Sequence, residues 1–255
     1  MESCIVVVVV LTCVIHIIYT DSDPDWGIVK SCLVKFNNLL VEGQGVIVSP
    51  RLVMTALHGG FAINTKFKES STNKKMVLLA QWFEKENVDM ALLQLEDDEV
   101  SFPKFLEILT REVVYQEKIS VVSLQNGMGG ALDFAAQRSS IFMFDSKTTL
   151  CRAQYYAADG LSGSGVITEV EGDGNVRVIG VHVLTHDATD PPMPIERASK
   201  KSKSADFESV SSSSSTHAKN IHGHIAYCMI CIASKVNGLV KLIQDSIEQS
   251  SQKAK

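Results

Sequence analysis

The stretch that decides the fold is Gly160-Leu161-Ser162-Gly163-Ser164-Gly165, which runs directly into the strand-forming residues Val166-Ile167-Thr168. Glycine on both sides of a serine allows backbone dihedral angles that a Cβ would forbid, and it lets a substrate carbonyl approach closely. Such a turn also directs amide N–H groups toward one point, here those of Gly160 and Ser162, which is the geometry of an oxyanion hole. Turns rich in glycine and serine are common, so a plain flexible turn is the alternative until other residues support a site.

The composition fits a folded protein with complete hydrophobic cores and argues against a nucleic-acid partner. A chain of 255 residues, 45% of them hydrophobic, can build one large β domain or two small ones with complete cores. Frequent short runs of valine and isoleucine favour strands. The net charge of −5 provides no basic surface, so we expect no nucleic-acid partner.

The N-terminus carries an uncharged apolar run over residues 5–18. This run is shorter than the roughly 20 residues of a spanning helix, and it fits the apolar region of a secretory signal. The preceding Glu2 and the exit Ile18-Tyr19-Thr20-Asp21 are atypical of such signals. We predict a signal peptide over 1–20, a secreted protein and no stable membrane span. A buried first strand or a membrane anchor is the alternative, which would make the protein cytoplasmic or membrane-anchored.

Alternating and apolar runs predict two series of strands. The first series lies over 26–36, 46–48, 52–58, 77–80 and 89–95, with an exposed loop over 65–75. A connection over 102–117 leads to a second series over 119–124, 139–144, 166–170, 176–183 and 221–233. The polar insert 187–219 is predicted to be disordered, and 235–249 has helical periodicity. This pattern indicates an all-β fold of two small barrels, over 26–110 and 111–249, closed by a terminal helix.

Two further residues supply the chemistry that a serine nucleophile needs. His58 ends a predicted strand beside two glycines, and Asp89 opens an apolar strand where a buried carboxylate requires a partner. A neutral imidazole can take the proton of a serine hydroxyl, and a carboxylate fixes the imidazole tautomer and stabilises its cation. Taken alone, His58 could be an ordinary surface imidazole and Asp89 a turn cap.

The three motifs together resemble those of the chymotrypsin-like serine proteases. Thr55-Ala56-Leu57-His58 resembles the Thr-Ala-Ala-His motif of that family, and residues 89–93 resemble its Asp-Ile-Ala-Leu-Leu strand. Residues 160–165 resemble its Gly-Asp-Ser-Gly-Gly-Pro turn, and 234–240 resemble its last strand running into the C-terminal helix. The resemblance covers about residues 27–247, apart from the serine-rich insert.

The resemblance implies two six-stranded antiparallel β-barrels with a C-terminal α-helix, and an active site in the cleft between them. It implies that Ser162 attacks the scissile carbonyl, that His58 acts as general base and then general acid, and that Asp89 orients His58. The N–H groups of Gly160 and Ser162 would stabilise the oxyanion. Protein or peptide substrates are expected, with no metal or cofactor, and we expect a monomer.

Departures from the family pattern refine this expectation. Leu161 replaces the acid that pairs with a new N-terminus in family members cut from zymogens, so Leu161 must support the loop by packing. Gly165 replaces a proline, and the cysteines that usually bracket the catalytic histidine are absent. These features resemble the bacterial glutamyl endopeptidases and the viral 3C-type proteases.

Specificity rests on three residues of the second half. Gly180-Val181-His182 resembles a Gly-Ile-His segment of those two groups, in which the histidine contacts a Glu or Gln side chain of the substrate. The threonine expected five residues before the nucleophile is Ala157, which weakens that pocket, and His182 as a simple strand residue is the alternative. Tyr156 stands where a trypsin-type pocket needs an aspartate, so cleavage after Lys or Arg is disfavoured.

The cysteines and neighbouring histidines offer a second possible site. Cys32, Cys151, Cys228 and Cys231 lie outside the leader and fit buried thiols as well as disulfides. His222 and His224 with Cys228 and Cys231 are zinc-type ligands, but side chains three apart on a strand point to opposite faces, which disfavours zinc.

The sequence therefore predicts a secreted serine endopeptidase with a possible preference for Glu or Gln before the cleaved bond. A catalytically silent homologue that binds proteins through the same cleft is the alternative from another functional class. An intracellular 3C-like processing protease is a third possibility, if the leader is structural.

Overall fold

The computed structural model describes residues 24–58, 61–83, 89–126, 131–144, 149–157, 160–168, 175–186, 209–210 and 224–253. The predicted signal peptide over 1–20 lies outside the described residues, and so does the predicted insert over 187–219 apart from residues 209–210.

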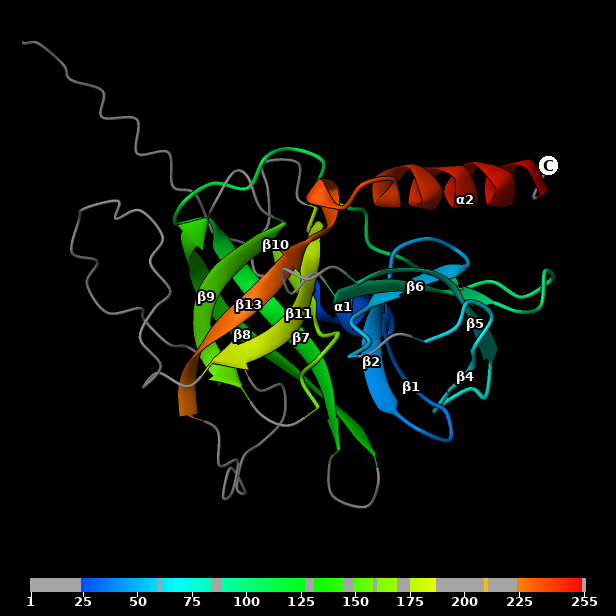
Figure 1. The fold of residues 1–255 in the computed structure, drawn as a ribbon, viewed down its shortest axis with the longest axis horizontal. Helices are drawn as coiled ribbons and strands as arrows, with labels where there is room; N and C mark the ends of the chain where they lie inside the picture. Colours follow the sequence, from blue (N-terminus) through cyan, green and yellow to red (C-terminus); the bar gives the residue numbers. More distant parts are fainter. Residues whose placement is uncertain are drawn as a thin grey trace, which may run out of the picture.

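The first series of strands closes into an antiparallel barrel (Figure 1). Its strands are β1 (Leu33–Asn37), β2 (Glu42–Ile47), β3 (Leu52–Thr55), β4 (Lys66–Glu69), β5 (Lys75–Phe83) and β6 (Asp89–Leu95), in the order β1-β2-β3-β6-β5-β4. Large apolar side chains such as Phe36, Met54 and Leu92 are fully buried in its core. The pairing of β1 with β4 closes the ring, and this pairing and that of β3 with β6 join strands that are not consecutive in the chain.

The second series forms a second closed antiparallel barrel. It consists of β7 (Lys118–Asn126), β8 (Leu132–Phe144), β9 (Leu150–Ala157), β10 (Gly165–Thr168), β11 (Val178–His186) and β13 (His224–Ile232). The pairing of β8 with β9 closes this ring, and the short β12 (Ser209–Val210) adds to the edge of β8. The prediction of an all-β fold of two six-stranded antiparallel barrels with a C-terminal helix is confirmed.

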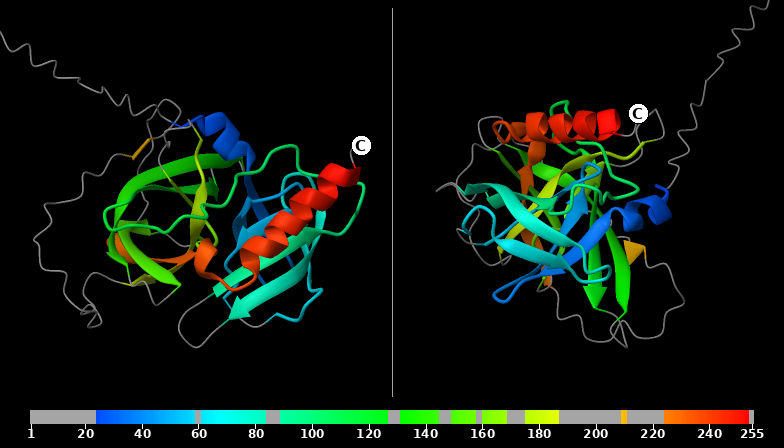
Figure 2. Two further views of the ribbon diagram at one scale, coloured as in Figure 1. Left: turned by 90° about the horizontal axis from the view of Figure 1, so that it is seen from above. Right: turned by 90° about the vertical axis from the view of Figure 1, so that its right-hand side faces the viewer.

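The C-terminal helix packs back onto the first barrel. After β13 and a 3₁₀ turn at Ala233–Lys235, α2 (Leu239–Lys253) runs along the first barrel, as Figure 2 shows. Leu239 and Ile243 are buried in a core cluster to which both barrels contribute, and Ser246 of α2 forms a 2.9 Å hydrogen bond with Ser49 of the first barrel. Trp82 Nε1 donates to the Asn237 carbonyl at 3.0 Å. The end of the chain therefore ties the second barrel to the first. Within the described residues, no helix combines the length and the apolar character needed to cross a membrane.

Two local predictions are wrong. Residues 26–31 form a helix, α1 (Trp26–Ser31), because Asp25 Oδ1 accepts hydrogen bonds from the N–H groups of Gly27 and Ile28 at 3.0 and 3.1 Å and so caps the first turn. The strand predicted over 26–36 is confined to β1. The loop predicted over 65–75 contains β4, a mostly charged strand in which Phe67 and Glu69 are buried.

We expect that the packing of α2 contributes measurably to stability. Ile243→Ala removes a side chain that is 3% exposed, and it should lower the free energy of unfolding by about 2–5 kcal/mol through lost burial and a residual cavity. Leu242→Ala, at the neighbouring position with 36% exposure, is the matched control and should cost clearly less. Chemical denaturation of the two variants measures the difference, and equal losses would contradict the packing described here.

Candidate active site

His58 follows β3 at the boundary between the barrels. Its side chain is 54% exposed, which leaves the imidazole open to a ligand. The backbone before it is fixed, because Leu57 N donates to Asp89 Oδ1 at 3.0 Å and Gln81 Nε2 donates to the Leu57 carbonyl at 3.1 Å. The imidazole is therefore exposed on a rigid support.

Asp89 is brought beside His58 by the register of two strands. It is the first residue of β6, and β6 pairs with β3 so that Ala91 lies opposite Thr55. Asp89 is buried, and its Oδ2 lies 2.8 Å from His58 Nδ1 while its Oδ1 accepts the Leu57 N–H. A carboxylate in this position holds the proton of the imidazole on Nδ1 and leaves Nε2 as the basic nitrogen.

Ser162 reaches His58 from the other barrel. The hydroxyl Oγ of Ser162 and Nε2 of His58 form a short hydrogen bond. The turn that carries Ser162 is held by hydrogen bonds from Gly163 N to the His182 carbonyl at 2.9 Å and from His182 N to the Ser164 carbonyl at 3.0 Å. The structure thus brings together His58, Asp89 and Ser162, which are far apart in the sequence.

The turn around Ser162 has the backbone conformation that its glycines permit. Gly160 and Gly163 have φ angles of +82° and +80°, in the left-handed region that favours glycine. Leu161 is buried in the core of the second barrel, so it anchors the turn by packing. Within the described part of the chain, nothing accepts a hydrogen bond from the N–H of Gly160 or of Ser162. Both donors therefore stay available to a ligand.

The environment of His58 strengthens it as a base. The hydrogen bond with Asp89 is the main cause that raises the pKa of His58 above its ordinary value, and the charge of Asp89 acts in the same direction. Partial burial lowers the pKa and opposes these two effects. An imidazole with a raised pKa binds the proton of a hydroxyl more firmly than a free imidazole does.

His182 has the opposite electrostatic environment. It is 2% exposed on β11, and its Nδ1 lies 2.6 Å from the Tyr155 hydroxyl. Burial lowers the pKa of His182 to about 4, with a smaller contribution from His58. The imidazole is therefore neutral at pH 7. Sequence reasoning did not find Tyr155, because a single tyrosine in an apolar strand gives no signal until the barrel closes around it.

The two other residues assigned to substrate binding lie at the end of β9. Tyr156 follows Tyr155 and points to the opposite face, where it is 38% exposed. Ala157 is the last residue of β9, and its backbone pairs with His224 of β13.

The residues considered for zinc do not form a site in the described part of the chain. Cys228 and Cys231 are buried as free thiols in different core clusters, and His222 lies outside the described residues. No group of three His, Cys, Asp or Glu side chains among the described residues could hold a metal ion.

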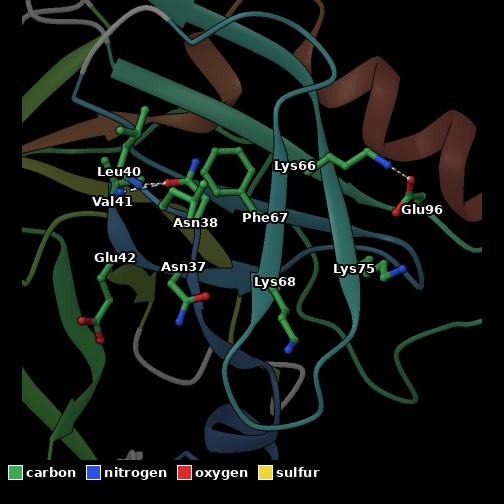
Figure 3. A pocket seen from close by; sticks show the side chains of 11 residues that line it. Asn37, Asn38, Leu40, Val41, Glu42, Lys66, Phe67, Lys68, Lys75 and Glu96 are labelled. Carbon is green, nitrogen blue, oxygen red and sulfur yellow. Dashed lines mark hydrogen bonds and ion pairs between the residues drawn. The ribbon is translucent and has the colours of Figure 1, made fainter.

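A separate hollow of about 790 Å³ lies between the β1–β2 turn and β4 (Figure 3). Asn38 Oδ1 shapes its edge by accepting hydrogen bonds from Leu40 N and Val41 N, both at 2.8 Å. A 2.6 Å ion pair between Lys66 and Glu96 lies at the opposite end. His58, Asp89 and Ser162 do not line it, so it is not the site described above.

Comparison with known proteins supports the fold. No protein-family model and no curated protein sequence matches the chain. Among solved structures, a cysteine-to-alanine mutant of the Tobacco Etch Virus protease has a TM-score of 0.55 at 16% identity, covering 87% of this chain and 81% of that one. The Rv3671c protease, in an inactive form, has a TM-score of 0.46 at 17% identity, covering 87% and 98%. The serine protease of human pathogenic astrovirus has a TM-score of 0.42 at 17% identity, covering 60% and 82%.

The similarity to the Tobacco Etch Virus protease agrees with the observed architecture. With two closed antiparallel barrels, a C-terminal helix and structural similarity to the Tobacco Etch Virus protease, the chain has the chymotrypsin-like protease fold. At these identities the comparison concerns the fold, and the activity has to be argued from the residues of the site.

We expect the pKa of His58 to depend on Asp89. Asp89→Asn removes both the charge and the carboxylate hydrogen bond that raise this pKa, so the pKa of His58 should fall. An NMR titration of the His58 ring protons measures the change. Asp98→Asn removes an exposed carboxylate that pairs with Arg51 at 2.8 Å, and as the control it should leave the titration of His58 unchanged. An unchanged pKa in Asp89→Asn would contradict the assigned pair.

Proposed function

We propose that this protein is a serine endopeptidase that cleaves peptide bonds of protein or peptide substrates through an acyl-enzyme on Ser162. One observation carries the proposal: His58 contacts Ser162 Oγ through Nε2 and Asp89 through Nδ1, the latter at 2.8 Å. A nucleophile, a base and a carboxylate in this linear arrangement are what serine acyl transfer requires. The protease fold supports the proposal by analogy.

The proposed reaction follows from the atoms in contact. As Ser162 Oγ attacks the carbonyl carbon, its proton passes to His58 Nε2, and the N–H groups of Gly160 and Ser162 stabilise the oxyanion. The tetrahedral intermediate then breaks its C–N bond, and the leaving amine takes the proton from His58. Water repeats the sequence on the acyl-enzyme and releases the carboxylic acid. Asp89 remains ionised and stabilises the imidazolium throughout.

A thiol nucleophile is not favoured by this structure. Cys32, Cys151, Cys228 and Cys231 are all buried, and burial raises the pKa of the Cys32 and Cys151 thiols. Cysteine nucleophiles need a thiolate, which forms in exposed and electropositive surroundings. The hydroxyl of Ser162 is therefore the nucleophile we propose.

A fluorophosphonate probe tests the proposal directly. The Ser162 oxygen should form a bond to phosphorus and displace fluoride, with the hydroxyl proton passing to His58, so that mass spectrometry finds the adduct on Ser162. Ser162→Ala should abolish labelling, and Ser164→Ala is the matched control because that buried serine lies two positions along the same turn. Well-folded protein that does not react would favour the catalytically silent homologue that binds proteins through the same cleft.

We also propose a preference for Glu or Gln before the cleaved bond. It is supported by a buried His182 whose backbone is hydrogen-bonded to Gly163 and Ser164, directly after Ser162, and whose Nδ1 contacts the Tyr155 hydroxyl. Since His182 Nδ1 faces the Tyr155 hydroxyl, a substrate side chain would contact the imidazole at Nε2. A neutral N–H donor suits the amide oxygen of Gln, whereas a carboxylate would lose its hydration without gaining a cation. Gln should therefore be preferred to Glu.

Tyr155→Phe tests this specificity. Removing the hydroxyl leaves His182 Nδ1 without that partner, so kcat/KM for peptides with Gln before the cleaved bond should fall about 3- to 10-fold, as expected for one neutral hydrogen bond. Labelling of Ser162 by a small fluorophosphonate should stay unchanged. Tyr115→Phe, on an exposed connection between the barrels, is the control. An unchanged peptide profile in Tyr155→Phe would remove the proposed role of the pair.

A further inference from the structure

Gln44 is a buried glutamine at the boundary between the two barrels. It lies on β2 between Gly43 and Gly45, and it is only 4% exposed. A glutamine is costly to bury unless its amide is hydrogen-bonded, so its partners indicate what it does. Gln44 belongs to the first barrel, yet both of its side-chain hydrogen bonds go to the second.

The two hydrogen bonds fix the orientation of the amide. Nε2 donates to the Gly160 carbonyl at 2.5 Å, and Oε1 accepts from Leu124 N of β7 at 2.9 Å. A backbone carbonyl only accepts and a backbone N–H only donates, so the reversed amide would face oxygen with oxygen and N–H with N–H. The side chain therefore has one satisfied orientation, with its N–H on Gly160.

The backbone of Gln44 also contacts the turn that carries Ser162 (residues 160–165). Its carbonyl accepts a hydrogen bond from Thr55 Oγ1 at 2.6 Å. The same carbonyl oxygen lies 2.0 Å from the position that a Cβ on Gly163 would occupy, so the turn rests directly on β2. Gln44 thus touches the chain on both sides of Ser162, at Gly160 through its side chain and at Gly163 through its backbone.

Gly160 has few other contacts among the described residues. No described residue lies within 4 Å of the position that a Cβ on Gly160 would occupy, so no described side chain packs there. Glycine adopts the φ of +82° seen at Gly160 at little energetic cost, and it can change to other φ angles equally readily. Among the described residues, Gln44 is the one that forms a hydrogen bond with Gly160. This hydrogen bond holds the Gly160 end of the peptide that joins Gly160 to Leu161, while the buried Leu161 side chain holds the other end.

We propose that Gln44 is a positioning residue for the oxyanion hole, holding the Gly160–Leu161 peptide so that the N–H groups of Gly160 and Ser162 face the same point. The inference rests on the proposed serine endopeptidase function and adds a residue to it. Gln44 touches no reacting atom; it acts through the loop that does. Donors aimed in advance stabilise a developing oxyanion without reorganisation during the reaction.

Gln44→Met tests the role with a side chain of similar length and no amide. Removal of one oxyanion-hole donor lowers kcat by about 10²–10³-fold. Gln44→Met leaves both donors present but no longer holds them in position, so we expect a smaller loss, a fall in kcat of about 10- to 100-fold. KM should stay within about twofold, because the substrate in its ground state does not use the oxyanion hole. Gln94→Met, a strand glutamine of β6 in the same barrel, is the control and should leave kcat unchanged.

Gln44→Glu separates positioning from simple support of the barrel interface. An ionised carboxylate still accepts from Leu124 N, but its second oxygen faces the Gly160 carbonyl and repels it, whereas a protonated carboxyl would donate to that carbonyl as the amide does. Lys35, which lies cross-strand from Gln44, already contacts Asn126 and Glu42. At a pH at which the new carboxyl is ionised, we therefore expect Gln44→Glu to lose at least as much kcat as Gln44→Met. Relative to the unsubstituted protein at the same pH, the loss should shrink as the carboxyl takes up a proton.

A peptide aldehyde and a non-hydrolysed product peptide give a second readout. The aldehyde forms a tetrahedral adduct on Ser162 whose oxygen occupies the oxyanion hole, whereas the product peptide binds without such an adduct. Both Gln44 variants should bind the aldehyde about 10- to 100-fold more weakly than the unsubstituted protein does. Their affinity for the product peptide should be unchanged. A merely structural defect would weaken both ligands together.

The outcomes distinguish this inference from the function on which it rests. Normal kcat in both Gln44 variants would overturn the positioning role while leaving the endopeptidase intact. Unfolding of both variants, measured by thermal melting, would overturn it in favour of a purely structural role. Failure of the unsubstituted protein to react with the fluorophosphonate would overturn the endopeptidase itself and this inference with it.

Discussion

The close contact between the turn that carries Ser162 (residues 160–165) and strand β2 is the constraint on which the site depends. A Cβ on Gly163 would lie 2.0 Å from the Gln44 carbonyl oxygen and 2.4 Å from Thr55 Oγ1, so only glycine allows the second barrel to approach the first this closely. Gly163 N is at the same time bonded to the His182 carbonyl of β11. The residue after Ser162 is thereby fixed against both barrels, and the serine hydroxyl can reach His58.

The other two site residues both belong to the first barrel. Asp89 begins β6, and His58 lies three residues after the end of β3, the strand that pairs with β6. The hydrogen bond from Leu57 N to Asp89 Oδ1 fixes the segment that carries His58, so the 2.8 Å distance between His58 and Asp89 is set by contacts within the first barrel. The second barrel has to be placed correctly against it, and the C-terminal segment helps, because Ser246 of α2 forms a hydrogen bond with Ser49 and Trp82 Nε1 donates to the Asn237 carbonyl.

The sequence predicts the fold class and names three candidate site residues that the structure brings together, and it fails where tertiary contacts decide. Short motifs around His58, Asp89 and Ser162 carry their chemistry locally, so they are visible before the chain folds. Residues 26–31 were predicted as a strand, because their apolar residues obscured the cap that Asp25 provides. Strand β4 was predicted as a loop, since its charged residues fit an exposed loop equally well. Gln44 and Tyr155 gave no signal, because their roles exist only once distant strands meet.

The two histidines near Ser162 show that position, and not residue type, decides what an imidazole can do. His58 is half exposed beside a carboxylate, and Asp89 raises its pKa. His182 is buried against a tyrosine hydroxyl, and burial lowers its pKa to about 4. When His58 takes a proton, its positive charge further disfavours protonation of His182, so the site holds at most one imidazolium near neutral pH. In the proposed reaction, a proton accepted at His58 would therefore stay beside Asp89, where the leaving amine could take it up, and would not pass to His182.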